Sequence, residues 1–300
     1  MIRIKQEKAW LRRFAADRGL DLVISDNRYG LAVPGVFCVF MTHQLQIRTP
    51  FGRWADLLLQ RMNYRLIGKF SRCWVPDIDG ADALAGELSN PVKKPHIPLR
   101  YIGRLSRMQP VAAGIRAVAD GMQPVAAIEE IRLLVLLSGP EPQRSLLEKR
   151  ILRQAAALSA ASVSGGIVLV RGLPGGGKAL KAVPASITVY DHLPAAALER
   201  LIAGARLVVA RSGYSTVMDL ARMRKNAVLV PTPGQTEQEY LGRYLAEKGW
   251  AICIRQQDLS LRDVLSQEGR EPHWPGDEKE DRLSAEISSV LDQSRPSALG

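Results

Sequence analysis

The sequence has few of the residues that build cross-linked or metal-centred proteins. Among its 300 residues there are three cysteines, Cys38, Cys73 and Cys253, without Cys-x-x-Cys spacing. Each lies in an apolar, strand-like stretch, so buried thiols in a reducing compartment are expected rather than disulfides or a metal site. The four histidines are too dispersed for a zinc pattern. No metal is therefore expected.

The N-terminal segment lacks a continuous apolar run. Residues 1–14 mix charged and aromatic side chains, a pattern typical neither of a secretory signal nor of a membrane span. Hydrophobic residues make up 46% of the chain and charged residues 24%, which are the proportions of a soluble globular protein of about two domains. We expect a cytoplasmic location.

Acidic residues are scarce in the first third of the chain. Residues 1–108 contain 18 Lys and Arg residues against 9 Asp and Glu residues, a net charge of +9, whereas the rest of the chain carries +2. A basic surface can contact anionic lipid, nucleic acid or an acidic substrate. We expect an anionic membrane surface, on the inner face of the membrane, and no nucleic acid.

The segment 52–69 is an expected amphipathic helix with two stripes. Arg61, Arg65 and Lys69 repeat at four-residue spacing, and an apolar stripe runs beside them, made of Trp54, Leu57, Leu58 and Met62. In one interpretation the basic face is solvated and the apolar stripe faces the core. In the other, the helix touches a membrane peripherally.

Apolar strand patterns alternate with helical patterns along the chain. Strands are expected at residues 22–24, 36–40, 73–77, 131–137, 167–170, 187–190 and 227–230, and helices at residues 6–18, 146–159 and 194–203. This alternation predicts parallel sheets covered by helices, with ligands beyond the carboxyl ends of the strands. Asp26 and His43 follow the first two strands and are expected to face a cleft.

One glycine-rich segment matches a nucleotide-binding motif but is interpreted as a surface turn. Residues 172–178 satisfy G-x-x-x-x-G-K and follow a strand. However, Ala179 lacks the hydroxyl that would hold magnesium, and Pro184 leaves no room for the helix that a phosphate-binding loop requires.

The most informative segment is 207–220. A strand runs into the turn Ser212-Gly213 and then into a helix that carries Asp219. Free backbone N–H groups at a helix start attract a phosphate or diphosphate, and an acid one turn inside can reach sugar hydroxyls. A second strand is followed by residues 231–240, a loop dense in amides and carboxylates. Together these patterns indicate a nucleotide-sugar pocket.

At these two motifs the chain resembles the glycosyltransferases with the two-domain GT-B fold, in particular the MurG-like branch, glycosyltransferase family 28. The resemblance covers most of the chain and is strongest over residues 133–251. It implies an α/β fold of two Rossmann-like domains with parallel sheets. It also implies transfer of a hexosyl group from a UDP-sugar, for which UDP-N-acetylglucosamine is a candidate, to an acceptor hydroxyl, without a cofactor or metal.

The resemblance also implies a division of the chain and roles for single residues. Residues 1–107 would be an incomplete, acceptor-side N-terminal domain, 108–130 a linker or insertion with a duplicated Met-Gln-Pro-Val-Ala-Ala, 131–270 the nucleotide-sugar domain, and 271–300 a helix and tail. Asp219 stands where the family places the acid that binds the donor ribose. The remaining donor positions are Arg107 and Gly139 at the diphosphate, Ser212, Gly213 and Thr216 at the nucleotide, Gln235, Gln238 and Glu239 at the sugar, and 190–193 at the uracil.

Catalysis is assigned to the first domain. His43 would take the proton of the acceptor hydroxyl or orient the acceptor, with Asp26 as a second acid–base residue, while positive charge and helix dipoles stabilise the departing diphosphate. A structural His43, bonded to a neighbouring carbonyl, is the alternative.

The chain departs from the family at its start, where it begins with a helix instead of a strand and a glycine-rich loop. About the first third of a GT-B chain is then expected to be absent, which predicts poor transfer and association with itself or with a partner chain that completes the domain. A lipid-linked acceptor is the expected second substrate. Two other functions stay open: a non-catalytic sugar-nucleotide-binding subunit or remnant, and a GT-B-fold sugar-nucleotide epimerase.

Overall fold

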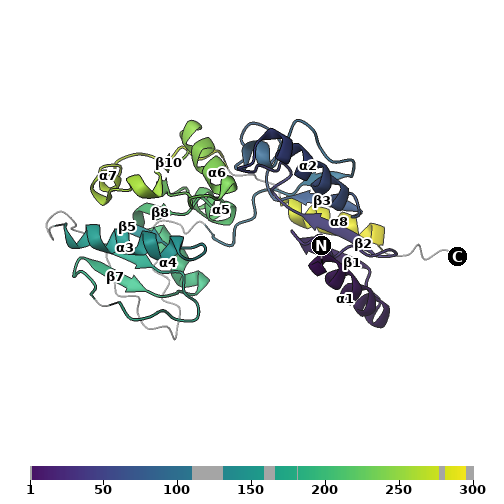
Figure 1. The fold of residues 1–300 in the computed structure, drawn as a ribbon, viewed down its shortest axis with the longest axis horizontal. Helices are drawn as coiled ribbons and strands as arrows, with labels where there is room; N and C mark the ends of the chain where they lie inside the picture. The colour runs from purple at the N-terminus through teal and green to yellow at the C-terminus, as the bar shows by residue number, and fades with distance from the viewer. Residues whose placement is uncertain (1, 110–130, 159–165, 181, 277–280, 295–300) are drawn as a thin grey trace. The chain divides into compact units, whose positions relative to one another are not determined.

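The chain folds into two compact units, seen in a computed structural model that describes residues 2–109, 131–158, 166–180, 182–276 and 281–294 (Figure 1). Unit 1 consists of Met1–Leu105 with Asp277–Gly300, and unit 2 of Ser106–Gly276. Each unit has its own parallel sheet, so the expected α/β architecture is confirmed. Most of the expected linker or insertion, residues 110–130, lies outside the described residues.

Unit 1 is built on a four-stranded sheet in the order β1-β2-β3-β4, with every neighbouring pair parallel. Its elements are α1 (Ile2–Arg18), β1 (Leu22–Asp26), β2 (Phe37–Met41), α2 (Arg53–Ile67), β3 (Arg72–Val75), a short 3-10 helix (Gly86–Leu88), β4 (Leu99–Tyr101) and α8 (Arg282–Ser294). The inner strands β2 and β3 are almost continuously apolar, as expected for parallel strands covered on both faces.

Helix α8 belongs to unit 1 although it comes from the other end of the chain. Its Val290 is fully buried in a cluster with Val39 and Trp74 of the sheet. Arg72 of β3 donates to the Glu286 carboxylate at 2.9 Å, and both side chains are largely buried. The first and last described segments of the chain therefore build one core together.

Helix α2 lies where the sequence predicts it, but the core-facing interpretation of its apolar stripe is wrong. Trp54 is 88% exposed and Leu58 70%, and Leu57 and Met62 are also exposed. The buried face carries Asn63 and Ile67. A polar side chain can occupy this face because Asn63 donates to the Leu45 carbonyl and accepts from the Tyr29 hydroxyl, so its buried amide has partners.

Unit 2 is built on a six-stranded parallel sheet in the order β10-β9-β8-β5-β6-β7. Its elements are β5 (Ile131–Leu136), α3 (Gln143–Ala156), β6 (Ile167–Val170), β7 (Ile187–Tyr190), α4 (Ala195–Gly204), β8 (Ala205–Ala210), α5 (Tyr214–Arg222), β9 (Ala227–Leu229), α6 (Thr236–Glu247), β10 (Ile252–Cys253), a 3-10 turn (Gln256–Asp258) and α7 (Leu261–Leu265). Its core is aliphatic, with Leu133, Val135, Leu169 and Leu207 fully buried.

The strand order of unit 2 contains a switch point beside β5. From β5 the chain moves to β6 and β7 on one side, and later returns to place β8, β9 and β10 on the other side. In open parallel sheets a crevice forms outside the carboxyl ends of the strands at such a point. The segments after β5 and β8 are therefore the first place to look for a ligand site.

Candidate functional site

Three loops of unit 2 meet at this switch point. They follow β5, β8 and β9, which are adjacent in the sheet. These loops, with the first turns of α5 and α6, contain seven of the nine predicted donor residues. Gly139, after β5, has a φ of 94°, and a Cβ at this position would lie 3.5 Å from the Thr232 Oγ1 in the loop after β9. The structure thus brings the glycine turn against the amide-rich loop.

The turn after β8 opens helix α5. Gly213 is its N-cap residue, and no side chain caps the helix start. Ser212 is fully buried and its hydroxyl donates to the Gln238 carbonyl at 2.7 Å. Ser212 therefore joins the turn to α6, whereas Gly213 and Thr216 are half-buried at the start of α5. The backbone of this helix start is the part that can meet an anion.

Asp219 lies within α5 with its carboxylate largely buried and paired. Its Oδ1 accepts a hydrogen bond from the Ser106 hydroxyl at 2.7 Å, and its Oδ2 lies 3.6 Å from the Arg107 Nε. The structure thus brings together two predicted donor residues, Asp219 and Arg107, that are far apart in sequence. Sequence reasoning missed Ser106, although it directly precedes Arg107.

The predicted sugar-binding side chains after β9 are engaged with their own loop. Gln238 accepts from the Thr232 N–H at 2.9 Å and donates to the Gln235 Oε1 at 2.5 Å. Glu239 accepts from the Gly234 N–H at 2.9 Å. These bonds fix the shape of the loop at the start of α6. A ligand that uses the same amides has to exchange these bonds for its own.

A buried arginine at the end of β8 links all three loops, and sequence reasoning gave it no role. Arg211 is fully buried. Its Nη1 donates to the Val230 and Pro231 carbonyls, and its Nη2 donates to the Gln143 carbonyl and the Gln256 Oε1. These acceptors are neutral, and burial lowers the pKa of Arg211 to about 10. Its local sequence, a charged residue beside a turn, carries no signal of this burial.

The predicted catalytic residues lie in unit 1. Asp26 is exposed at the end of β1, where it pairs in register with Met41 of β2, and the half-buried His43 follows β2 by two residues. Both therefore lie at the carboxyl edge of the same sheet, as the sequence predicts. The donor residues belong to unit 2.

The glycine-rich segment 172–178 forms a turn closed by a carboxylate. The Gly177 N–H donates to Asp191 at 2.9 Å, and Arg171 donates to the other oxygen of this carboxylate at 2.5 Å. The hydrogen bond from the Gly177 N–H, and to a smaller extent the one from Arg171, hold the pKa of Asp191 below its usual range. Arg171 is in turn paired with the buried Glu148. An N–H that would face a phosphate in a nucleotide-binding loop is thus occupied, which confirms the interpretation as a turn.

Among the residues that the structure describes, no group of three or more His, Cys, Asp or Glu side chains is arranged to hold a metal ion. None of the described helices is both long and apolar enough to cross a bilayer.

The second half of the chain is similar in sequence to known glycosyltransferases. Residues 180–285 match the glycosyltransferase family 28 C-terminal domain. A UDP-N-acetylglucosamine–N-acetylmuramyl-(pentapeptide) pyrophosphoryl-undecaprenol N-acetylglucosamine transferase of Desulforudis audaxviator is 39% identical over 98 residues, which cover 31% of this chain and 25% of that protein. The match thus spans about a quarter of this relative.

Solved structures extend the likeness of the fold to the whole chain. The glycotransferase of kitacinnamycin superposes with a TM-score of 0.62 at 14% identity, covering 96% of this chain and 80% of that one. Acinetobacter baumannii MurG gives a TM-score of 0.51 at 14% identity, covering 98% and 72%. The chain therefore has the GT-B fold.

Proposed function

We propose that this chain, which carries a glycosyltransferase family 28 C-terminal domain, binds a UDP-sugar in unit 2 and transfers the hexosyl group to an acceptor hydroxyl. The observation that carries this proposal is the Asp219 carboxylate inside α5, held by Ser106 and Arg107 beside a helix start without a side-chain cap. The family match covers this segment. UDP-N-acetylglucosamine is the first donor to try, because the curated relative is named for it.

The chemistry assigned to the donor pocket follows from these groups. The Asp219 carboxylate accepts hydrogen bonds from the ribose hydroxyls, and the backbone at the start of α5 faces the diphosphate. Arg107 is 63% exposed and lies 3.6 Å from Asp219, so this weak ion pair can open and turn the guanidinium towards the diphosphate. Negative charge that develops on the leaving group would then meet fixed dipoles and a cation.

Removal of the proton from the acceptor hydroxyl is assigned to residues of unit 1. His43 is the proposed base and Asp26 the proposed second acid–base residue, since both lie at the carboxyl edge of the sheet. We expect transfer to continue in the presence of a chelator, because Arg107 and the α5 dipole take the part that a metal plays elsewhere. A His43→Gln variant that retains UDP affinity and loses turnover would support this assignment.

The proposed location is the cytoplasm, with peripheral contact to the inner face of the membrane. Helix α2 supports it, because its exposed apolar residues lie beside basic ones, including Arg61 and Arg65. Such a helix lies in the plane of an anionic bilayer surface, where a lipid-linked acceptor is presented. Self-association, or a partner chain that completes unit 1, stays a prediction.

The donor site is tested by calorimetry with UDP. In Asp219→Asn the shape is kept and the charge is lost, so we expect UDP affinity to fall by about 1–3 kcal/mol, the usual loss of a hydrogen bond to a charged group. The matched control is Asp263→Asn, an exposed acid on α7 of the same unit. Unchanged affinity in Asp219→Asn would remove Asp219 from the site.

Product analysis then separates the three functions. Incubation of the whole protein with UDP-N-acetylglucosamine and a lipid-linked or sugar acceptor should release UDP and yield a glycosylated acceptor. An isomerised sugar would identify an epimerase. Tight UDP binding without either product, at every acceptor tried, would identify a binding subunit.

A further inference from the structure

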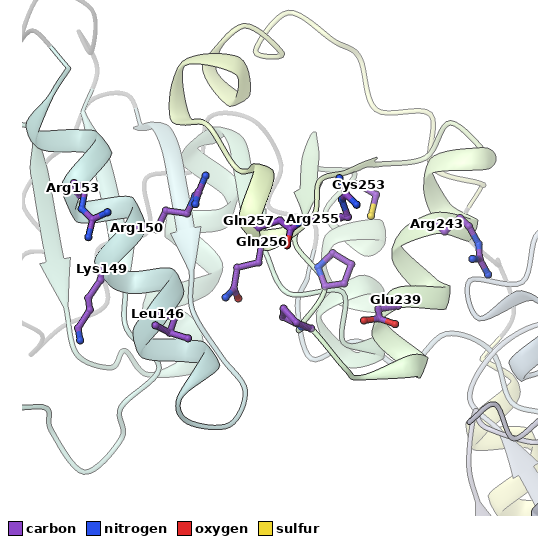
Figure 2. A pocket seen from close by; sticks show the side chains of 12 residues that line it. Leu146, Lys149, Arg150, Arg153, Glu239, Arg243, Cys253, Arg255, Gln256 and Gln257 are labelled. Carbon is purple, nitrogen blue, oxygen red and sulfur yellow. The ribbon is translucent and has the colours of Figure 1, made fainter. Parts of the chain in front are cut away.

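Unit 2 contains a recess whose lining does not include Asp219. It has a volume of about 800 Å³ and lies between α3 on one side and α6 with β10 on the other (Figure 2). This volume is typical of a small-molecule site. It is lined by Leu146, Lys149, Arg150, Arg153, Pro231, Pro233, Glu239, Arg243, Cys253, Arg255, Gln256 and Gln257.

The charge of this recess is strongly one-sided. Five of its side chains are basic and one is acidic, although the net charge of the chain beyond residue 108 is only +2. Within the described residues, neither Lys149 nor Arg153 of α3 has an ion pair, and both are exposed. Arg243 of α6 lies 3.9 Å from the Glu247 carboxylate, a long ion pair. These three cations can bind an anion without first giving up a close partner.

A buried charge lies behind the lining. Arg211 donates to the Pro231 carbonyl and to the Gln256 side chain, and both residues line the recess. The Arg211 guanidinium has only neutral acceptors, and its Nε is buried without a hydrogen-bond partner in the described structure. An arginine stays charged at physiological pH. The buried Arg211 therefore adds to the positive potential in the recess, although its own effect at the solvent-exposed surface is small.

Part of the lining of the recess is apolar. Leu146 of α3, Pro231 and Pro233 after β9, and Cys253 of β10 contribute carbon and sulfur surface to the lining. A fully solvated inorganic anion would leave this surface unused. A ligand that fits both features has an apolar body and a phosphate group.

We propose that this recess is a binding site for a phosphate ester with an apolar moiety, separate from the donor pocket. The phosphate lies against Lys149 and Arg153 of α3, and the apolar part lies against the apolar residues of the lining. Ser212, Thr216, Asp219 and Arg107 line no part of the recess, and only Glu239 belongs to both sets of residues. The ligand is a soluble phosphate ester or the headgroup region of an anionic lipid.

Cys253 provides a reporter for occupancy. It is half-buried on the wall of the recess, whereas Cys38 and Cys73 are buried in unit 1. Alkylation of the whole protein with the neutral reagent iodoacetamide, followed by mass mapping of the modified peptides, reads this site alone. The two probes are inorganic diphosphate and phosphatidylcholine vesicles with or without phosphatidic acid.

We expect one or both probes to slow alkylation of Cys253. Protection by diphosphate indicates a soluble ligand, and protection only by vesicles that contain phosphatidic acid indicates a lipid headgroup. In the double variant Lys149→Gln/Arg153→Gln, the probe concentration for half-protection should rise about tenfold or more, as expected when hydrogen bonds to charged groups are lost. Arg262→Gln, an exposed cation on α7 outside the recess, is the matched control.

Two results would overturn the proposal. One is no protection by either probe, and the other is equal protection in the double variant and in Arg262→Gln. Protection by polyglutamate but by neither phosphate probe would assign the recess to an acidic peptide and equally overturn it. Asp219→Asn should leave the protection unchanged, so a failure here is distinct from a failure of the donor site.

Discussion

Cys73 is the residue whose burial has the clearest consequence for solution behaviour. It is fully buried in the core of unit 1, and burial raises the pKa of its thiol to about 12. In the unfolded chain the pKa of this thiol is about 8.5. Above that pH the unfolded state binds fewer protons than the folded state, so unfolding becomes more favourable as pH rises. The protonated Cys73 thiol contributes fully to stability below about pH 8.5, and this contribution is lost as the pH rises from there to the pKa of the folded state.

The prediction is a falling free energy of unfolding between about pH 8.5 and 10, measured by urea titration. In Cys73→Ala the slope should become shallower by up to about 1.4 kcal/mol per pH unit, the contribution of one proton. Cys253→Ala, which removes a half-buried thiol from unit 2, should change the slope less. An unchanged slope in Cys73→Ala would mean that this thiol ionises in the folded protein.

At this scale the sequence predicted which residues matter better than it predicted what they contact. The apolar context correctly indicated buried thiols at Cys38 and Cys73, but Cys253 is only half-buried. The motif after β8 singled out Asp219 as the acid for the donor ribose, which stays a prediction. Its partner Ser106 lies in a distant segment, and local pattern carries no signal for such a contact. Arg211 was missed because a charged residue beside a turn suggests solvent, while its burial depends on acceptors from three other segments.

The loop between β6 and β7 depends on one glycine. Gly172 has a φ of 71°, and a Cβ there would lie 2.3 Å from the Leu137 carbonyl oxygen at the end of β5. Backbone cannot yield as a side chain can. Gly172→Ala should therefore lower the free energy of unfolding by more than about 2 kcal/mol, through strain and a displaced loop.

The same loop offers a matched control. A Cβ on Gly175 meets nothing within 4 Å, and its φ lies outside the left-handed region. Gly175→Ala should thus change the free energy of unfolding by less than about 0.5 kcal/mol in the same urea titration. Equal effects of the two substitutions would show that the loop relaxes freely around residue 172.

Helix α2 is predicted to bind anionic vesicles. Leu57 and Leu58 are exposed, so Leu57→Ser/Leu58→Ser should leave the urea midpoint almost unchanged and weaken sedimentation with phosphatidylglycerol vesicles by about tenfold or more. Raised salt should weaken binding by the wild-type protein as well, since charges beyond about 8 Å are screened at physiological ionic strength. Val92→Ser, an exposed apolar residue of a loop, is the control. Vesicle binding indifferent to both lipid charge and the double substitution would leave α2 without this role.

Periodicity predicted that α2 exists but not which way it faces. Its apolar stripe is a regular one, and a core-facing stripe is the usual meaning of that pattern. The sheet-facing side is instead satisfied by hydrogen bonds from Asn63 and Gln60 to the loop backbone at Leu45. Such partners come from tertiary contacts. For the same reason the three-residue strand β4, whose pattern has no alternation to detect, was not foreseen.

Removal of α8 is predicted to affect the two units differently. A chain that ends at residue 276 loses Val290 from the cluster with Trp74, and it leaves the largely buried Arg72 without Glu286. The removal also opens the apolar face around Trp74 to water, which destabilises the sheet. Hydrogen exchange should therefore become fast throughout β2 and β3, while the strands of unit 2 stay protected and UDP binding persists.

Substitution of Glu286 gives the graded form of this test. Glu286→Gln keeps the size of the side chain and a hydrogen-bond acceptor for Arg72, so exchange in β2 and β3 should increase less than on removal of α8. Wild-type protection of β2 and β3 in the truncated chain would mean that the sheet is stable without its last helix.

The division into two units was visible in the sequence, but the return of the chain end was not. The alternation of strands and helices correctly predicted two parallel sheets. The sequence of α8 does not indicate which sheet the helix packs on, because Leu283, Ile287 and Val290 could pack against any aliphatic surface. Only the contacts of the folded chain show that they belong with strands that begin more than two hundred residues earlier.

This arrangement has a consequence for synthesis on the ribosome. Domains generally fold as units during translation, N-terminal first, at about 5–20 residues per second. Here the strands of unit 1 are made first, but the helix that covers Trp74 is made last, after all of unit 2. The nascent sheet therefore waits on the order of ten to thirty seconds with an apolar face uncovered. During that interval unit 2 can complete its own fold. Unit 2 would thus finish folding before unit 1, although most of unit 1 is synthesised earlier. The uncovered sheet of unit 1 would then be the part of the nascent chain that a ribosome-bound chaperone has to shield.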